Sequence, residues 1–144
     1  SVEEARELYE MVSALETSLL KIAFPRITNR IIEDAGKILV LMDTEKDCIR
    51  WRDLNQMFHN LLFEPADRPL TLDMLARLRQ KTDRNIRRHL SSMRNESQLQ
   101  HRAILAAVAA GDLEAALEAL ADHLAYTSND LQSCMRLEQG RKKR

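Results

Sequence analysis

Four side chains of this sequence have the chemistry of metal ligands, and two of them are one helical turn apart. Asn55 and His59 lie in a predicted helix and share a face, because residues four apart differ by about 40° around the axis. That face lies beside an apolar stripe formed by Trp51, Leu54, Phe58 and Leu61. Asp53 is the nearest acid, but it points about 120° away from His59 and cannot share a ligand with it. Alone the pair is a weak signal, because an inward histidine is more often a hydrogen-bonded core residue.

Two further histidines lie on apolar faces of helices farther along the chain. His101 shares its face with Ile104, Leu105 and Val108, and His123 shares its face with Ala116, Leu120 and Thr127. A buried imidazole without a partner costs a few kcal/mol, so these polar groups satisfy either one another or a shared ion. Three imidazoles and one amide oxygen suit Zn²⁺, Ni²⁺, Mn²⁺ or Fe²⁺, and helix bundles often hold such sites. The alternative is three separate core histidines, each with a backbone partner.

The composition restricts the class of protein. The chain has 144 residues, 44% of them hydrophobic, with 22 basic and 22 acidic side chains. Equal numbers of basic and acidic side chains leave no excess of positive charge that would indicate binding to nucleic acid or to an anionic membrane. Two cysteines without a framework spacing indicate a reducing compartment, and neither a signal peptide nor a long apolar run is present. We therefore expect a soluble cytoplasmic protein, with one domain over residues 1–138 and a solvated basic tail over residues 139–144.

Apolar residues recur every three or four positions throughout, which predicts an all-α fold. The first helix carries a stripe at Leu8, Met11, Leu15, Leu19 and Ile22. Asn95 and Gln98 resemble a capping box that would open the fifth helix, and Gly111 would close it. The expected helices cover residues 2–24, 27–44, 45–63, 71–93, 95–111 and 112 to about 135. The sequence thus predicts an antiparallel bundle of about six helices.

Four short motifs, in order, carry a family likeness over essentially the whole chain. They are Leu8-Tyr-Glu10 with Leu15-Glu16, Asn55-Gln-Met-Phe-His59, the segment from Gln100 to Asp112 that contains His101-Arg-Ala-Ile-Leu, and His123. Together they resemble the FadR-type C-terminal (FCD) domain of GntR-family bacterial transcription regulators. The resemblance implies an effector-binding, homodimeric domain attached to an N-terminal winged helix-turn-helix that binds DNA. No winged-helix sequence precedes the first predicted helix, so we expect any DNA binding to belong to a domain outside these 144 residues.

Many members of this family hold a divalent metal and bind a small carboxylate at it. The resemblance assigns the metal-ligand roles to Asn55, His59, His101 and His123. The chain departs from the family pattern in two places. Neutral Asn55 stands where many members have Asp, and Val12 stands where the first helix often carries an arginine that contacts the carboxylate.

Another cation could replace the arginine that is missing at Val12. Arg52 lies about 20° from His59 around its helix, so its guanidinium could clamp a carboxylate beside the metal. Arg79, on the edge of the apolar stripe of the fourth predicted helix, is a weaker candidate, and His89 on the same helix is a third. The alternatives are that Arg52 reaches solvent or pairs with a neighbouring acid, and that His89 is a core or rim residue.

Three functions are compatible with these residues. The leading hypothesis is a ligand-sensing regulatory domain without catalytic residues. A small metal-dependent hydrolase is the alternative, but it would need a general base, and no acid is predicted on the inward faces of the helices that carry His59, His101 and His123. Asp53 and Asp122 flank ligands in the sequence but point elsewhere. The third option is a metal-free packing module whose helices only dimerise.

Overall fold

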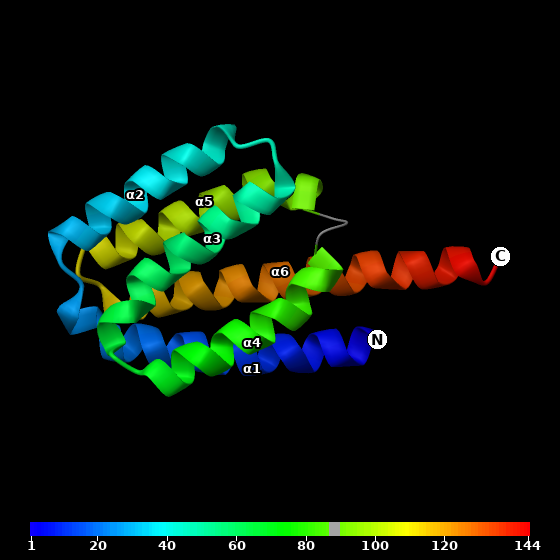
Figure 1. Cartoon of the computed structure of the whole chain (residues 1–144), viewed down its shortest axis with the longest axis horizontal. Coiled ribbons are helices and arrows are strands. Elements are labelled where there is room, and N and C mark those ends of the chain that lie inside the picture. Colours follow the sequence, from blue (N-terminus) through cyan, green and yellow to red (C-terminus); the bar gives the residue numbers. More distant parts are fainter. Residues whose placement is uncertain (87–89) are drawn as a thin grey trace.

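The computed structural model describes residues 1–86 and 90–144. It describes the side chains of these residues except within the range 84–92. Within those residues the chain forms six α-helices, and consecutive helices run in opposite directions (Figure 1). The elements are α1 (Val2–Ala23), η1 (Phe24–Arg26), α2 (Asn29–Thr44), α3 (Cys48–Phe63), η2 (Glu64–Ala66), α4 (Pro69–Ile86), α5 (Leu90–Ala109) and α6 (Leu113–Lys142), where η1 and η2 are single 3₁₀ turns. The predicted antiparallel all-α bundle is confirmed.

Short polar side chains determine where several helices begin. Thr28, Asp47 and Asp112 each accept a hydrogen bond from a backbone N–H two or three residues on, at the starts of α2, α3 and α6. Gly111 closes α5 with a φ of 69°, a left-handed conformation that costs glycine little. The breaks expected at Gly111 and Asp112 are therefore present.

The boundary between α4 and α5 differs from the prediction. The fourth helix was expected to reach Met93 and the fifth to begin at Asn95, but α4 ends at Ile86 and α5 begins at Leu90. Met93 is buried and Asn95 exposed within α5, so Asn95 does not cap a helix. No glycine or proline lies between Pro69 and Gly111, so nothing in the sequence interrupts the helical periodicity there.

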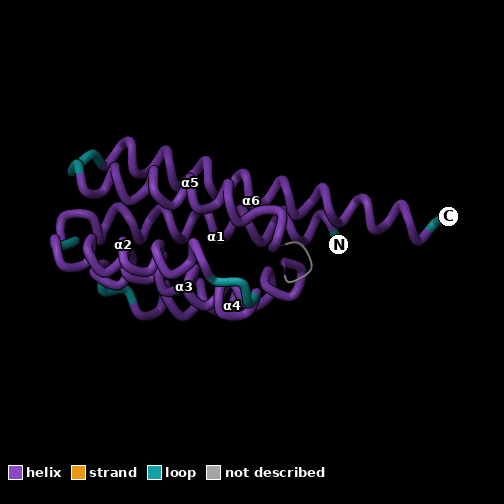
Figure 2. Tube along the Cα trace, turned by 90° about the horizontal axis from the view of Figure 1, so that it is seen from above, coloured by secondary structure: helices purple, strands orange, loops and turns teal. Residues whose placement is uncertain are grey.

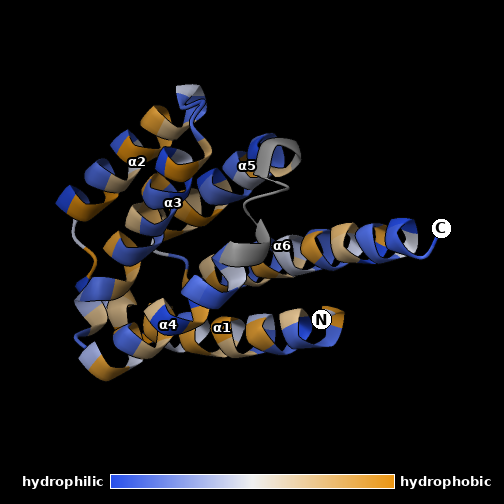
Figure 3. Cartoon of the chain, turned by 45° about the vertical axis from the view of Figure 1, so that its right-hand side comes forward, coloured by the Kyte–Doolittle hydropathy of each residue, from blue (hydrophilic) through white to orange (hydrophobic). Residues whose placement is uncertain are grey.

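All six helices contribute buried side chains to one main core. α6 packs against α5 and α1, α2 packs against α3 and α5, and α4 packs against α1 (Figures 1 and 2). Hydrophobic and hydrophilic segments alternate along the helices, as expected where each helix buries one side (Figure 3). The fully buried large side chains include Leu19, Leu20, Phe58, Phe63, Ile104 and Leu120. The buried faces of α1, α3, α5 and α6 therefore meet inside the bundle.

The buried face of α1 coincides only in part with the predicted stripe, with Leu19 common to both. It consists of Ala5, Tyr9, Val12, Glu16, Leu19, Leu20 and Ala23. Met11, which was expected inside, is 40% exposed, while Leu8, Leu15 and Ile22 are only partly buried. Apolar residues occur all around α1, so periodicity alone did not identify the buried side. The actual face carries one acid, Glu16, which is 2% exposed.

The last helix extends past the rest of the bundle at the end where α1 begins (Figure 1). Its later turns contribute Leu131 and Met135, which form a small second core with Ala5 and Tyr9. The basic residues of the expected tail continue α6 as far as Lys142 and are exposed. Among the described residues, no helix combines the length and apolar character that crossing a bilayer requires.

Candidate metal centre

Three histidines from three helices meet in the core. His59 of α3, His101 of α5 and His123 of α6 each offer a ligand atom, and these atoms lie within 4.8 Å of one another. The ring centroids are 5.1 Å apart for His59 and His101, 5.3 Å for His59 and His123, and 4.6 Å for His101 and His123. The exposed fraction is 5% or less for each residue. The structure thus brings together the three histidines that the sequence singled out.

Burial favours the neutral form of all three imidazoles. Burial lowers the pKa of His59 and of His101 well below the ordinary value, and the neighbouring histidines lower it further. Burial lowers the pKa of His123 to about 4. A neutral imidazole is the form that binds a metal, so burial prepares the cluster for coordination.

Two glutamines of α5 set the orientation of two of these rings. His101 Nδ1 lies 3.0 Å from Gln98 Oε1, and His123 Nδ1 lies 2.7 Å from Gln100 Oε1. An amide oxygen only accepts, so each Nδ1 carries the hydrogen and each Nε2 keeps its lone pair. Within the described part of the chain, His101 Nε2 and His59 Nδ1 are buried without a hydrogen-bond partner. A metal ion bound in the cluster would use such lone pairs.

Gln98 is itself fixed by the neighbouring helix α2. Its Nε2 donates to the Leu39 carbonyl and to Asp43 Oδ1, each at 2.9 Å. Arg102 also donates to Asp43, and these contacts hold the pKa of Asp43 below its usual value. The amide oxygen of Gln98 can therefore face only His101. The sequence pattern assigned Gln98 to a capping box. In the structure Gln98 instead lies one turn before His101 on α5 and accepts a hydrogen bond from its imidazole.

Replacing Gln98 with leucine is expected to weaken Zn²⁺ binding about ten- to a hundredfold, the usual effect of losing a partner that orients a ligand. Isothermal titration of the metal-free protein with Zn²⁺ measures this change. Gln132→Leu is the matched control, because Gln132 is also buried but its hydrogen bonds to described residues, Ser128 and Arg136, stay within α6. Equal dissociation constants for both variants and the wild type would contradict the role of Gln98.

Asn55 shares a cavity with two of the histidines. It lines a cavity of about 80 Å³ together with His59 and His123. Its Oδ1 is buried and lacks a hydrogen-bond partner among the described residues. The cavity lining thus combines imidazole groups with one amide oxygen, and such a set of donors would suit a divalent transition metal.

A buried ion pair forms another wall of this cavity. Glu16 Oε1 of α1 lies 2.7 Å from an Arg79 nitrogen, and a second Arg79 nitrogen donates to Asn60 Oδ1 at 2.8 Å. Burial raises the pKa of Glu16, while Arg79 opposes that shift. No acid was expected on the inward faces of the helices that carry the histidines, but two acids from other helices, Glu16 of α1 and Asp83 of α4, line the cavity. Asp53 and Asp122 are exposed, as expected.

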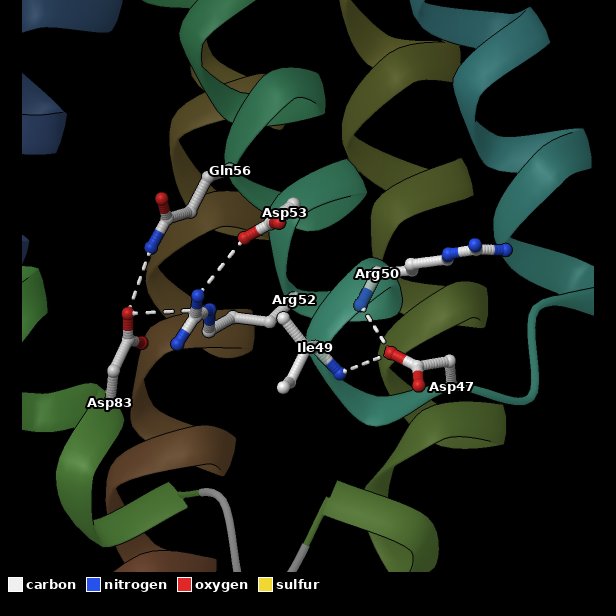
Figure 4. Close-up of polar contacts among 7 residues, drawn as sticks. All are labelled: Asp47, Ile49, Arg50, Arg52, Asp53, Gln56 and Asp83. Atoms are coloured by element: carbon white, nitrogen blue, oxygen red, sulfur yellow. Dashed lines mark hydrogen bonds and ion pairs between the residues drawn. The ribbon is translucent and has the colours of Figure 1, made fainter.

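Arg52 lies where the cavity meets an outer cleft of about 480 Å³ between α3 and α4. Its guanidinium is 3.1 Å from Asp53 and 3.7 Å from Asp83, and Gln56 donates to Asp83 at 2.9 Å (Figure 4). Arg52 is thus paired with acids, which was the alternative to a free carboxylate clamp. Arg79 also lines both spaces. His89, the third effector candidate, lies outside the described residues.

Six α-helices in the described part of the chain thus surround a buried cluster of three histidines. Residues 7–126 match the family model of the FCD domain, so the chain belongs to the FCD domain family. FCD domains of GntR-family regulators are regulatory and not enzymatic, which excludes the hydrolase alternative. A ligand-sensing regulatory role is therefore the function that the family supports.

Among solved structures, the chain is similar in fold to a GntR-family transcriptional regulator from Pseudomonas syringae pv. tomato, with a TM-score of 0.88 and 22% sequence identity. The match covers 98% of this chain and 60% of that regulator. The chain therefore spans somewhat over half the length of that protein. A comparison with proteins of curated function gave no match.

Proposed function

We propose that this domain senses a small carboxylate at a divalent metal (Zn²⁺, Ni²⁺, Mn²⁺ or Fe²⁺) held by Asn55, His59, His101 and His123. The observation that carries the proposal is the meeting of three buried, neutral imidazoles whose ligand atoms lie within 4.8 Å. When bound, the ion supplies a fixed positive charge to which a carboxylate can bind. The protein side chains position the ion, and the glutamine partners keep the imidazole lone pairs available.

The effector would enter from the outer cleft. Arg52 and Arg79 line both the cleft and the inner cavity, so either guanidinium could hold the end of the effector that lies away from the metal. Val12 is buried and lines the same cavity, at the position where the family often carries an arginine. Arg52 on α3 or Arg79 on α4 would then bind the effector carboxylate in place of the arginine that α1 lacks at Val12.

We further propose that the domain is homodimeric and controls DNA binding by a winged-helix domain in a longer regulator. The GntR-family structure that shares this fold is longer than this chain, which supports a second domain. Large apolar side chains on the surface, at Val40, Leu41, Ile49, Met57 and Leu70, support contact with a partner subunit.

Native mass spectrometry of the protein dialysed against Zn²⁺ tests both parts of this proposal. We expect particles of two chains that carry one metal ion per chain, and any co-purified acid would appear as additional mass. A metal-free dimer would contradict the metal site, and a metal-loaded monomer at tens of micromolar would contradict the dimer. Elemental analysis of the same sample provides an independent count of the metal.

A further inference from the structure

The proposed ligand set carries no negative charge. Asn55 is an amide, and an imidazole that binds a metal through its lone pair is neutral. The groups that accept hydrogen bonds from His101 and His123 are also amides, where metal-bound histidines often have a carboxylate. Neither the ligands nor these partners would offset the two positive charges of a divalent ion.

The cavity wall does not supply the missing charge either. Its charged side chains among the described residues are Glu16, Arg52, Arg79 and Asp83. Each acid lies against one of the arginines, at 2.7 Å for Glu16 and Arg79 and at 3.7 Å for Asp83 and Arg52. Their formal charges cancel. Among the described carboxylates, none has an oxygen in the group of ligand atoms that gathers within 4.8 Å.

A divalent ion in this site would therefore be buried with its charge uncompensated. Removing such an ion from water is costly unless an opposite charge accompanies it. The cavity offers room for that charge, since its volume of about 80 Å³ is several times the roughly 10–15 Å³ that one water needs. An added anion can thus share the cavity with the metal.

We propose that the metal and a small dicarboxylate bind this domain as a coupled, electrically neutral pair, each only weakly without the other. This inference rests on the proposed function and names the ligand class as a dianion. The domain then responds to the simultaneous presence of metal and acid. Coupling is reciprocal, so the dicarboxylate tightens metal binding by the same factor by which the metal tightens dicarboxylate binding.

The test is titration of the metal-free full chain with Zn²⁺ at pH 7, with malonate, acetate, malonamide or no addition. Malonate should tighten Zn²⁺ binding about ten- to a hundredfold, within the usual range of coupling between two ligands. Acetate should have a smaller effect because it carries one charge, and uncharged malonamide should have none. Malonate also binds free Zn²⁺, but that competition weakens apparent binding and cannot produce the expected tightening.

Asn55→Asp provides the decisive comparison, because it places one negative charge in the ligand set with almost no change of size. The variant should bind Zn²⁺ more tightly than the wild type without any anion, and malonate should add less. Asn129→Asp is the matched control, since Asn129 is exposed on α6 and outside the cavity lining. That control should behave as the wild type does. A thermal melt followed by circular dichroism verifies that both variants fold.

The possible results separate this inference from the proposed function. If the wild type binds Zn²⁺ equally well with and without malonate, the metal site stands and the coupling is overturned. If malonamide acts as strongly as malonate, charge is not the cause and the inference is again overturned. If neither the wild type nor Asn55→Asp binds Zn²⁺ under any condition, the proposed function fails with it.

Discussion

Replacing Arg79 with methionine is expected to lower the free energy of unfolding by about 3–5 kcal/mol, because it leaves a buried carboxylate without its partner. Glu16 is 2% exposed, and its one close cation among the described residues is Arg79 at 2.7 Å. Urea denaturation at pH 7 measures the loss. Arg77→Met is the matched control on the same helix, since Arg77 pairs with Asp73 on the exposed surface and should contribute at most about 1 kcal/mol.

Removing both charges should restore most of the lost stability. Apolar replacements of a buried ion pair are often neutral or stabilising, so Glu16→Leu combined with Arg79→Met should lie close to the wild type. The deficit of the single variant should also depend on pH. Burial raises the pKa of Glu16 and Arg79 opposes this, so without Arg79 the folded protein binds a proton more readily than the unfolded chain. The deficit is then smallest below pH 4.5, the ordinary pKa, and grows as pH rises through the folded pKa. A double variant as unstable as the single one would contradict this explanation.

Glu16 also shows why part of the site was not predictable from helical periodicity. A charged residue on a helix is normally assigned to the solvent face, and only its neighbours indicate otherwise. Val12 and Leu20 lie four residues before and after it, and Tyr9 and Ala23 lie seven residues away. All of these are buried, so Glu16 occupies the centre of an apolar face. The partner Arg79 is 63 residues distant, and no local rule pairs the two.

The histidines were predictable because each is anchored to the apolar pattern of its own helix. Asn55 and His59 are one turn apart, and His101 and His123 occupy positions that apolar neighbours place in the core. Burial follows from that pattern, but the meeting of the three rings depends on how α3, α5 and α6 pack. The glutamine partners were not predicted, because Gln100 reaches His123 on another helix. The break after Ile86 was missed for a different reason, since no residue type marks it.

Removing the metal should destabilise the wild type and leave a variant without the site unaffected. A ligand that binds only the folded protein stabilises it by about 2.7 kcal/mol when its concentration is a hundred times Kd. We therefore expect addition of a chelator to Zn²⁺-loaded protein to lower the free energy of unfolding by about that amount. His101→Ala should show no response to chelator, because His101 Nε2 is a buried lone pair at the centre of the cluster.

Ile104→Val distinguishes loss of the metal from general loss of stability. Ile104 is buried on α5 one turn after His101, and removing one methyl group from such a residue costs about 0.5–1.5 kcal/mol. This variant should be less stable than the wild type but should keep the full response to chelator. Urea denaturation of all three proteins, with and without chelator, gives the required free energies. An identical response in the wild type and in His101→Ala would show that the histidine cluster does not hold the metal, because only direct coordination links that imidazole to the effect of the chelator.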